Sequence, residues 1–371
     1  MGGCSGGIGG TVTLDGTQTA VGLQFVRGDY TITGGTALNL ISYSGNGIII
    51  PPVPELRVLA GETATIESTI TGSKGFEKTG DGLLILSGSN SYSGGTILSA
   101  GTLQISAADN LGQARNDLTI NNGTLQTIGT ISFGSLVTLG GEAAFDVASG
   151  TELQLTGIIS GSGSLTKQGD GTLLAGNTAN GWSGGTLIEA GTLRMAAGSA
   201  GALPDMTDYV MTGGTLDLNG NALTMRSLWG SDGIIAIDNA SLTVNQDEDT
   251  VFAGDITGAS ANSSLTKDGD GILVLTGNNS FQGRTNILGG MLAIYEAENI
   301  GTGAAGISIS NATLTTLGDI TLARDFELSG TATVDTLLGT ALDLTADVSG
   351  SGSLYKGRGG GLAYHQRRCQ P

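Results

Sequence analysis

Short runs of alternating apolar and polar residues fill most of the chain. Runs such as Glu152–Leu155 place an apolar residue at every second position, runs such as Thr124–Ile128 do so less strictly, and Gly, Asn or Ser follow. A period of two is typical of strands with one buried face. Steps such as Gly94-Gly95 and Asp81-Gly82 supply the positive φ angles that sharp turns need. Only Ala107–Ala114 comes near a helical period, so the pattern predicts an almost purely β protein.

One longer motif recurs and organises the chain. It reads Lys78-Thr79-Gly80-Asp81-Gly82, then Lys167-Gln168-Gly169-Asp170-Gly171, then Lys267-Asp268-Gly269-Asp270-Gly271, at intervals of 89 and 100 residues. Each copy continues with an apolar run and a polar turn that ends in an aromatic residue: Tyr92, Trp182 or Phe281. The copies start near residues 73, 164 and 264, and a broken fourth copy starts near 353. Such self-similarity indicates a repeat architecture.

A shorter period lies inside the long one. The step from Leu103 to Leu125 recurs, one position longer, from Leu193 to Leu216, and its length is typical of one solenoid coil. A coil of about 20 residues cannot bury its apolar face alone, but it can when stacked on similar coils. We therefore predict, for residues 1–356, an all-β, right-handed single-stranded parallel β-helix with about 20–23 residues per coil. Strands should pair in parallel at offsets of about 22 residues.

The recurrent residues have mainly structural interpretations. Asp before Gly is turn chemistry, so we expect the aspartates of the three motifs to be turn residues. Their pairing with the motif lysines is interpreted as exposed ion pairs that add little stability. We expect each of the three aromatic residues to pack over its own turn. The alternative is a spaced row of aromatics that contacts a glycan or another protein.

Composition narrows the possible chemistry. The 33 acidic and 15 basic residues give a net charge of −18, which disfavours binding to nucleic acid or anionic lipid. No run of 18 apolar residues predicts a transmembrane helix. His365 is the only histidine, and Cys4 and Cys369 are the only cysteines. A Ser-His-Asp triad, a histidine metal site and a disulfide framework are therefore not expected, and we expect no cofactor.

Two local motifs have a functional interpretation beside the structural one. Asp247-Glu248-Asp249 is the densest acidic cluster, and a β-helical polysaccharide lyase or glycosidase would need paired carboxylates or a calcium cluster. We favour a solvated turn there. Arg27-Gly28-Asp29 is the tripeptide that integrins bind. Its neighbours suggest a turn between strands, where Gly-Asp is ordinary, with cell attachment as the alternative.

The repeat also carries a family resemblance. The segment Ser264–Gly271 with Asn279-Ser280-Phe281, together with Tyr92–Thr96 and Ala100–Leu103, resembles the passenger-associated transport repeat of autotransporters. The resemblance implies a β-helical passenger that is exported and then carried through the outer membrane by a C-terminal barrel. It also implies adhesion, aggregation or biofilm formation, with proteases and lipases as minority members.

We therefore expect a fragment of a surface-displayed stalk or adhesin that is not an enzyme, with an inert structural spacer as the alternative. Outward Thr, Ser and Asn suit weak multivalent contact with a second copy, with matrix proteins or with glycans. The start has no signal peptide and the end no barrel, so we expect the chain alone to stay in the cytoplasm, inactive and without inserting into a membrane. Residues 357–371 carry Arg358, Arg367 and Arg368 against an acidic body, and we expect a disordered tail there.

Overall fold

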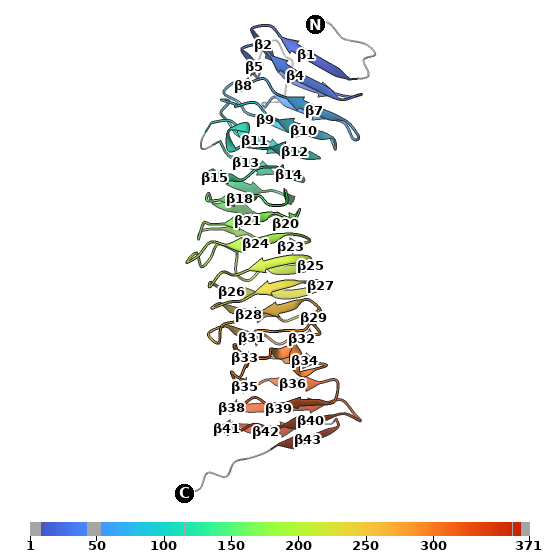
Figure 1. The fold of residues 1–371 in the computed structure, drawn as a ribbon, viewed down its shortest axis with the longest axis vertical. Coiled ribbons are helices and arrows are strands. Elements are labelled where there is room, and N and C mark those ends of the chain that lie inside the picture. The colour runs from blue at the N-terminus through green and yellow to red at the C-terminus, as the bar shows by residue number, and fades with distance from the viewer. Residues whose placement is uncertain (1–8, 43–52, 114–115, 358, 365–371) are drawn as a thin grey trace. The chain divides into compact units, whose positions relative to one another are not determined.

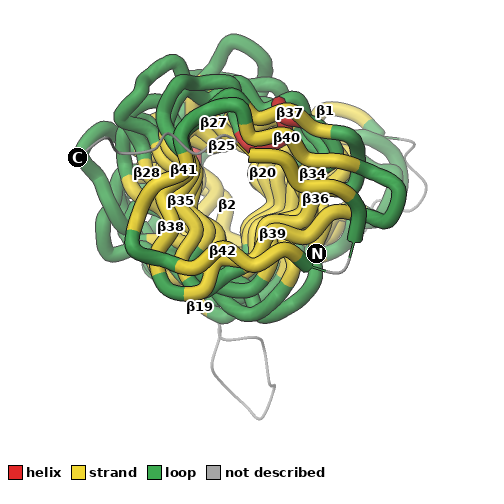
Figure 2. The backbone as a smooth tube through the Cα atoms, turned by 90° about the horizontal axis from the view of Figure 1, so that it is seen from below, coloured by secondary structure: helices red, strands yellow, loops and turns green. Residues whose placement is uncertain are grey.

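The computed structural model describes residues 9–42, 53–113, 116–357 and 359–364. Within these ranges the helical segments are two short 3-10 turns, η1 (Ala108–Leu111) and η2 (Ala297–Ile300), and the strands pair in parallel. The chain divides into two compact units, Met1–Gly184 and Gly185–Pro371. In each unit the strands are stacked as successive rungs (Figure 1), surround a common interior and leave the loops outside (Figure 2).

The first unit has three sides. Its first ladder consists of β1 (Gly10–Leu14), β4 (Tyr30–Gly34), β7 (Thr63–Ile66), β10 (Leu83–Leu86), β12 (Thr102–Ile105), β14 (Gly123–Thr127), β17 (Glu142–Val147) and β20 (Ser164–Gln168). Its second ladder consists of β3 (Gly22–Phe25), β6 (Glu55–Val58), β9 (Phe76–Thr79), β11 (Thr96–Leu98), β13 (Leu118–Ile120), β16 (Val137–Leu139), β19 (Ile159–Gly161) and β22 (Gly181–Trp182). The third side holds β2 (Thr17–Ala20), β5 (Ala37–Leu40) and β8 (Ile70–Thr71), and farther along the chain β15 (Ile131–Phe133), β18 (Glu152–Leu155) and β21 (Thr172–Ala175).

The second unit repeats this plan. Its first ladder consists of β23 (Thr186–Ile188), β25 (Asp208–Asp217), β27 (Ser227–Ala236), β29 (Thr250–Phe252), β32 (Ile272–Leu275), β34 (Met291–Ile294), β36 (Thr313–Thr316), β39 (Thr331–Thr336) and β42 (Ser353–Lys356). Its second ladder consists of β26 (Ala222–Met225), β28 (Ser241–Asn245), β31 (Ser264–Asp268), β33 (Arg284–Ile287), β35 (Ile307–Ser310), β38 (Phe326–Ser329) and β41 (Val348–Gly350). The third side holds β24 (Thr192–Met195), β30 (Asp255–Thr257), β37 (Ile320–Leu322), β40 (Ala341–Leu344) and β43 (Gly361–Tyr364), and the second halves of β25 and β27 pair there with β24 and β30.

The predicted parallel β-helix is confirmed, and its interior consists of side-chain columns. Leu84 pairs with Leu103, Leu103 with Leu125, and Leu125 with Phe145, and all four side chains are at most 2% exposed. Burying one such side chain contributes about 1.5–3 kcal/mol. The direct pairing of Leu103 with Leu125 is the offset that the sequence predicted. Other offsets differ, because individual turns are longer or shorter: the step from Leu84 to Leu103 is shorter than the step from Leu103 to Leu125.

The long repeat does not equal a whole number of coils. In the first unit, Lys78 lies in β9 of the second ladder, whereas Lys167 lies in β20 of the first ladder. The aromatic residues differ in the same way. Tyr92 lies in the loop between β10 and β11, and Trp182 lies in β22 of the second ladder. Equivalent residues of these two copies therefore lie on different sides of the coil, which excludes a straight row.

The segment from Gly357 onward, for which we expect a disordered tail, includes one further strand. Gly361–Tyr364 forms β43, which pairs with β40 so that Leu342 lies opposite Leu362. The Gly361 N–H donates to Thr340 O over 2.7 Å. The alternating pattern of the body persists through Leu362 and lets this strand form. Residues 365–371, including the arginines at 367 and 368, lie outside the described residues, as does Arg358.

Candidate functional site

The motif lysines occupy inward positions, contrary to our expectation of exposed ion pairs. Lys78, Lys167 and Lys267 are all 0% exposed. Each lies in a column of apolar side chains: Lys78, for example, pairs with Leu56 on one side and Leu98 on the other. The strand alternation explains this position, because Lys167 follows the buried Leu165 by two residues and therefore shares its face.

Backbone carbonyl oxygens bind the buried ammonium groups. Lys78 Nζ donates to Thr79 O (3.1 Å), Gly80 O (2.6 Å) and Ala100 O (3.0 Å). The first two oxygens belong to the corner that follows the lysine, and Ala100 belongs to the next coil. The second half of the motif, Ala100–Leu103, therefore recurs with the lysine because the two meet in space. Charged groups can be buried only when they are bonded in this way.

The same bonds form in the other copies. Lys267 Nζ donates to Asp268 O (2.7 Å), Gly269 O (2.8 Å) and Gly289 O (3.4 Å). Lys167 Nζ donates to Gln168 O (2.6 Å) and Gly169 O (2.7 Å). In the broken fourth copy, Lys356 Nζ reaches Gly357 O (3.4 Å) and Gly359 O (2.9 Å), but its side chain is exposed.

The aspartates of the motif lie outside this bond set. Asp81, Asp170 and Asp270 are exposed at the corners, as predicted for turn residues. The glycine before each has a positive φ, +70° at Gly80, which favours glycine in this corner. Burial lowers the pKa of Lys78 from 10.5 to about 8, and the negative charge of Asp81 opposes that shift. The pKa values of Lys167 and Lys267 are lowered to about 8 for the same reason.

The lowered lysine pKa predicts a pH-dependent stability. Between pH 8 and 10.5 the unfolded chain binds the Lys78 proton more often than the folded chain does, so the unfolding free energy rises with pH. This contribution is complete above the unfolded pKa and is lost as pH falls through the folded pKa. Lys78→Met removes the titration at similar volume. We expect the unfolding free energy of the wild type to rise by about 2 kcal/mol relative to that of Lys78→Met from about pH 7 to about pH 9.5, measured by urea unfolding. A difference that does not change with pH would contradict the buried ammonium.

The recurrent aromatic residues are buried. Tyr92 and Phe281 are 0% exposed and Trp182 is 1% exposed. The Tyr92 ring packs against Phe76 at a centroid distance of 5.3 Å, and its hydroxyl and the Thr96 hydroxyl are 2.7 Å apart. None of the three can present its ring to a glycan or a partner protein.

Buried asparagines join the turns of successive coils, a role that our sequence analysis did not assign, although it named Asn279 as part of the repeat motif. Asn279 precedes Phe281 by two residues and is 0% exposed. Its Oδ1 accepts the Ile256 N–H at 2.6 Å, and its Nδ2 donates to Asn299 O. Asn299 itself lies in η2, where its Oδ1 accepts two backbone N–H groups at 2.8 Å and its Nδ2 donates to Gly277 O at 2.9 Å.

The first unit contains the same pair of asparagines. Asn90 Oδ1 accepts the Ile70 N–H at 2.7 Å, and Asn90 Nδ2 donates to the carbonyl of Asn110 in η1 at 2.6 Å. Asn180 occupies the equivalent place in the second copy, where it accepts the Ile159 N–H at 2.7 Å. The available signal was an asparagine two residues before each aromatic residue.

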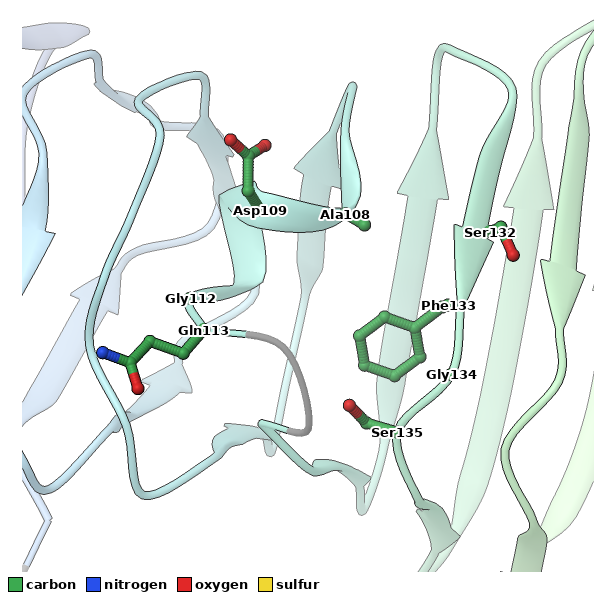
Figure 3. Close-up of a pocket in the computed structure, with 8 residues that line it drawn as sticks. All are labelled: Ala108, Asp109, Gly112, Gln113, Ser132, Phe133, Gly134 and Ser135. Atoms are coloured by element: carbon green, nitrogen blue, oxygen red, sulfur yellow. The ribbon is translucent and has the colours of Figure 1, made fainter.

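The two equivalent turns also form shallow pockets. The first, of about 410 Å³, lies between the η1 segment and the end of β15, with the Phe133 ring as its apolar wall (Figure 3). Asp109 is its carboxylate, and this group already accepts a hydrogen bond from Ser89 Oγ at 2.6 Å. In the second unit, η2 and the segment from Thr321 to Arg324 line a pocket of about 420 Å³. Neither lining supplies the paired carboxylates that glycoside hydrolysis needs.

Arg324 closes the second pocket from inside the protein. Its guanidinium is nearly buried and donates to Ala305 O (2.7 Å), Ile300 O (2.6 Å) and Gly283 O (3.0 Å). Burial lowers the pKa of Arg324 to about 10. Like the motif lysines, this cation binds backbone carbonyls of neighbouring coils.

The aspartates of both local motifs, Arg27–Asp29 and Asp247–Asp249, accept hydrogen bonds from backbone N–H groups of other coils. The Arg27–Asp29 turn connects β3 to β4, and Asp29 Oδ1 accepts the Thr63 N–H at 2.9 Å. In the acidic cluster, Asp249 Oδ1 accepts the Ile272 N–H at 2.9 Å, and Asp247 Oδ1 accepts the Asp270 N–H at 3.4 Å. Both carboxylates thus cap the turn of the next coil, and cell attachment through Arg27-Gly28-Asp29 stays the alternative to a structural turn.

The two cysteines and the histidine of the sequence, Cys4, Cys369 and His365, lie outside the described residues. Among the residues that the structure describes, no group of three or more His, Cys, Asp or Glu side chains is arranged to hold a metal ion. No helix in the same ranges has the length and apolar character that crossing a membrane would require.

Comparison with known proteins supports the resemblance of the repeat. The family model of the passenger-associated-transport-repeat matches residues 76–105, 165–195 and 265–294. The chain is 34% identical over 248 residues to a protein named adhesin BmaC autotransporter, from Brucella suis biovar 1 (strain 1330). That alignment covers 64% of this chain but 7% of the relative. No solved structure matches the chain significantly. Each family match begins within the strand that carries a buried lysine, β9, β20 or β31. Each match ends at the last residue of a strand of the next coil, β12, β24 or β34. The chain therefore contains three passenger-associated transport repeats and is similar, over most of its length, to a short segment of an autotransporter adhesin.

Proposed function

We propose that this chain is an adhesive stretch of a surface-displayed passenger and acts without catalysis. The observation that carries the proposal is the outward face of the coils, where polar side chains form continuous rows. Gln104 Nε2 donates to Gln126 Oε1 at 2.5 Å, and Gln126 Nε2 donates to Asp146 Oδ2 at 2.7 Å, across three stacked strands. Such rows offer many equivalent weak contacts instead of one pocket.

The relative and the charge support the same function. The relative is named an adhesin, and its alignment includes most of this chain. The net charge of −18 favours basic partners and disfavours nucleic acid. In the full-length parent we expect display at the cell surface, with self-association or binding to matrix proteins and glycans, in the service of aggregation or biofilm formation. The alternative is an inert spacer that holds another adhesive region away from the cell.

Display of the chain on a cell tests this function. The chain is fused between an export signal and the outer-membrane barrel of an autotransporter, and cell settling and binding to matrix proteins are measured against cells that display the barrel alone. We expect both to increase, and Asp29→Ala to leave most of the increase intact because many coils contribute. Correctly displayed chain with neither activity would leave the inert spacer. Hydrolysis of polysaccharides by the purified chain would show that it is an enzyme.

A further inference from the structure

An apolar strip crosses the outer face of the first ladder in the second unit. It consists of outward residues at one register position of four adjacent strands: Val210, Trp229, Val251 and Val274. Val210 pairs with Trp229, and Val251 pairs with Val274. Gly230 pairs with Phe252, which places Trp229 beside Val251. Trp229 is 49% exposed and Val251 is 51% exposed.

On one side the apolar surface continues to Leu187 of β23, which pairs with Val210. On the other side, farther along the ladder, the outward residues Thr313, Thr315 and Thr333 are polar. The other tryptophan, Trp182, is 1% exposed. Four strands span about 15 Å, so the strip is a contiguous apolar patch and not a single exposed side chain. Contiguous patches of this kind mark interaction surfaces more often than scattered apolar residues do.

Carboxylates border the strip. Ser227 precedes Trp229 by two residues on the same face of β27 and lines a hollow of about 330 Å³ together with Asp208, Arg226, Asp247 and Glu248. The one cation of this lining is already engaged, because Arg226 Nε donates to Asp208 Oδ1 at 2.9 Å. The hollow therefore has a net negative charge. Asp232, which is exposed, follows Trp229 by three residues.

We propose that this strip binds a basic segment of a partner protein in which apolar side chains alternate with lysine or arginine. The apolar side chains pack on the valines, and one cation lies over the Trp229 ring, where a cation–π contact is favourable. A second cation pairs with Glu248 in the hollow. Charge complementarity at the strip selects this partner, because the bordering hollow holds three carboxylates and one engaged cation and would repel an acidic segment or an anionic polysaccharide. The inference rests on the adhesive function proposed above and names one of its contacts.

A synthetic peptide of alternating lysine and leucine tests the proposal, with a glutamate-for-lysine peptide as the charge control. Dissociation constants are measured on the full chain by anisotropy of the labelled peptide. Because Trp182 is buried, a change of tryptophan emission on binding reports Trp229. We expect Trp229→Ser and Glu248→Lys each to weaken binding by about tenfold. Two exposed positions outside the strip provide matched controls: Leu338→Ser and Glu142→Gln should bind as wild type does.

The outcomes separate this inference from the proposed function. Equal binding by wild type and both strip variants, or equal weakening by the two control variants, would overturn the strip as the site. Dimerisation that Trp229→Ser abolishes would assign the strip to a second copy and overturn the proposal, as would a neutral oligosaccharide that binds at Trp229 while the peptide does not. If cells that display the chain adhere although the peptide does not bind, the strip is not the peptide site, and the adhesive function stands. Peptide binding by a displayed chain that does not adhere would support the strip and reject the adhesive function.

Discussion

Replacement of Lys78 by alanine is expected to lower the unfolding free energy by about 3 kcal/mol. The substitution leaves three carbonyl oxygens without a donor, those of Thr79, Gly80 and Ala100. It also opens a cavity between Leu56 and Leu98, the neighbours in the inward column. Release of a desolvated ammonium offsets part of this loss. Urea unfolding followed by circular dichroism measures the difference.

Lys74→Ala is the matched control for this substitution. Lys74 is exposed and precedes Lys78 by four residues, so its removal should change stability by less than about 0.5 kcal/mol. Equal effects of Lys74→Ala and Lys78→Ala would show that Lys78 is a surface residue, as the turn chemistry of the motif first suggested.

The second large effect is expected for Asn279→Ala, at about 2–3 kcal/mol. Asn279 is fully buried and holds the Ile256 N–H and the Asn299 carbonyl at once, so the substitution leaves two buried backbone groups unpaired. Its neighbour Asn278 is exposed, and Asn278→Ala should cost little. Thermal unfolding of the two variants under identical conditions gives the comparison. A larger loss for Asn278→Ala would contradict the assigned bonds.

The fold could be predicted because two periods of the sequence, the strand alternation and the coil spacing, indicate the same architecture. Alternation of apolar residues defines strands, and the spacing of Leu103 and Leu125 defines the coil. Since parallel stacking is the arrangement that buries such strands on one face, the β-helix could be predicted from these residues alone. Small variations in turn length could not be predicted from the sequence. Because these variations decide which ladder a residue joins, the placement of Lys78 and Lys167 on different sides of the coil could not be predicted either.

The roles of the polar residues were harder to predict. Lysine before Gly-Asp-Gly suggests a surface ion pair, yet the alternation from Leu165 to Lys167 already places the lysine on the inward face. Its acceptors are backbone carbonyls, which every sequence has, so no residue type marks them. The same holds for the asparagines, whose partners are backbone groups of other coils. The exposed strip at Trp229 could not be predicted, because it depends on register between β25, β27 and β29.

The burial of the lysines, the asparagine bonds and the outward rows all depend on parallel stacking in the observed register. Gln104 lies opposite Gln126, and Gln126 lies opposite Asp146, so Gln104 and Asp146 are two strands apart. Adjacent strands are about 4.8 Å apart, within the Cα separation that a disulfide allows, whereas about 9.6 Å is beyond it. In a background with Cys4→Ser and Cys369→Ser, mild oxidation should cross-link the pair Gln104→Cys/Gln126→Cys rapidly and leave the pair Gln104→Cys/Asp146→Cys reduced. Absence of the first cross-link, or equal formation of both, would contradict the stacked coils.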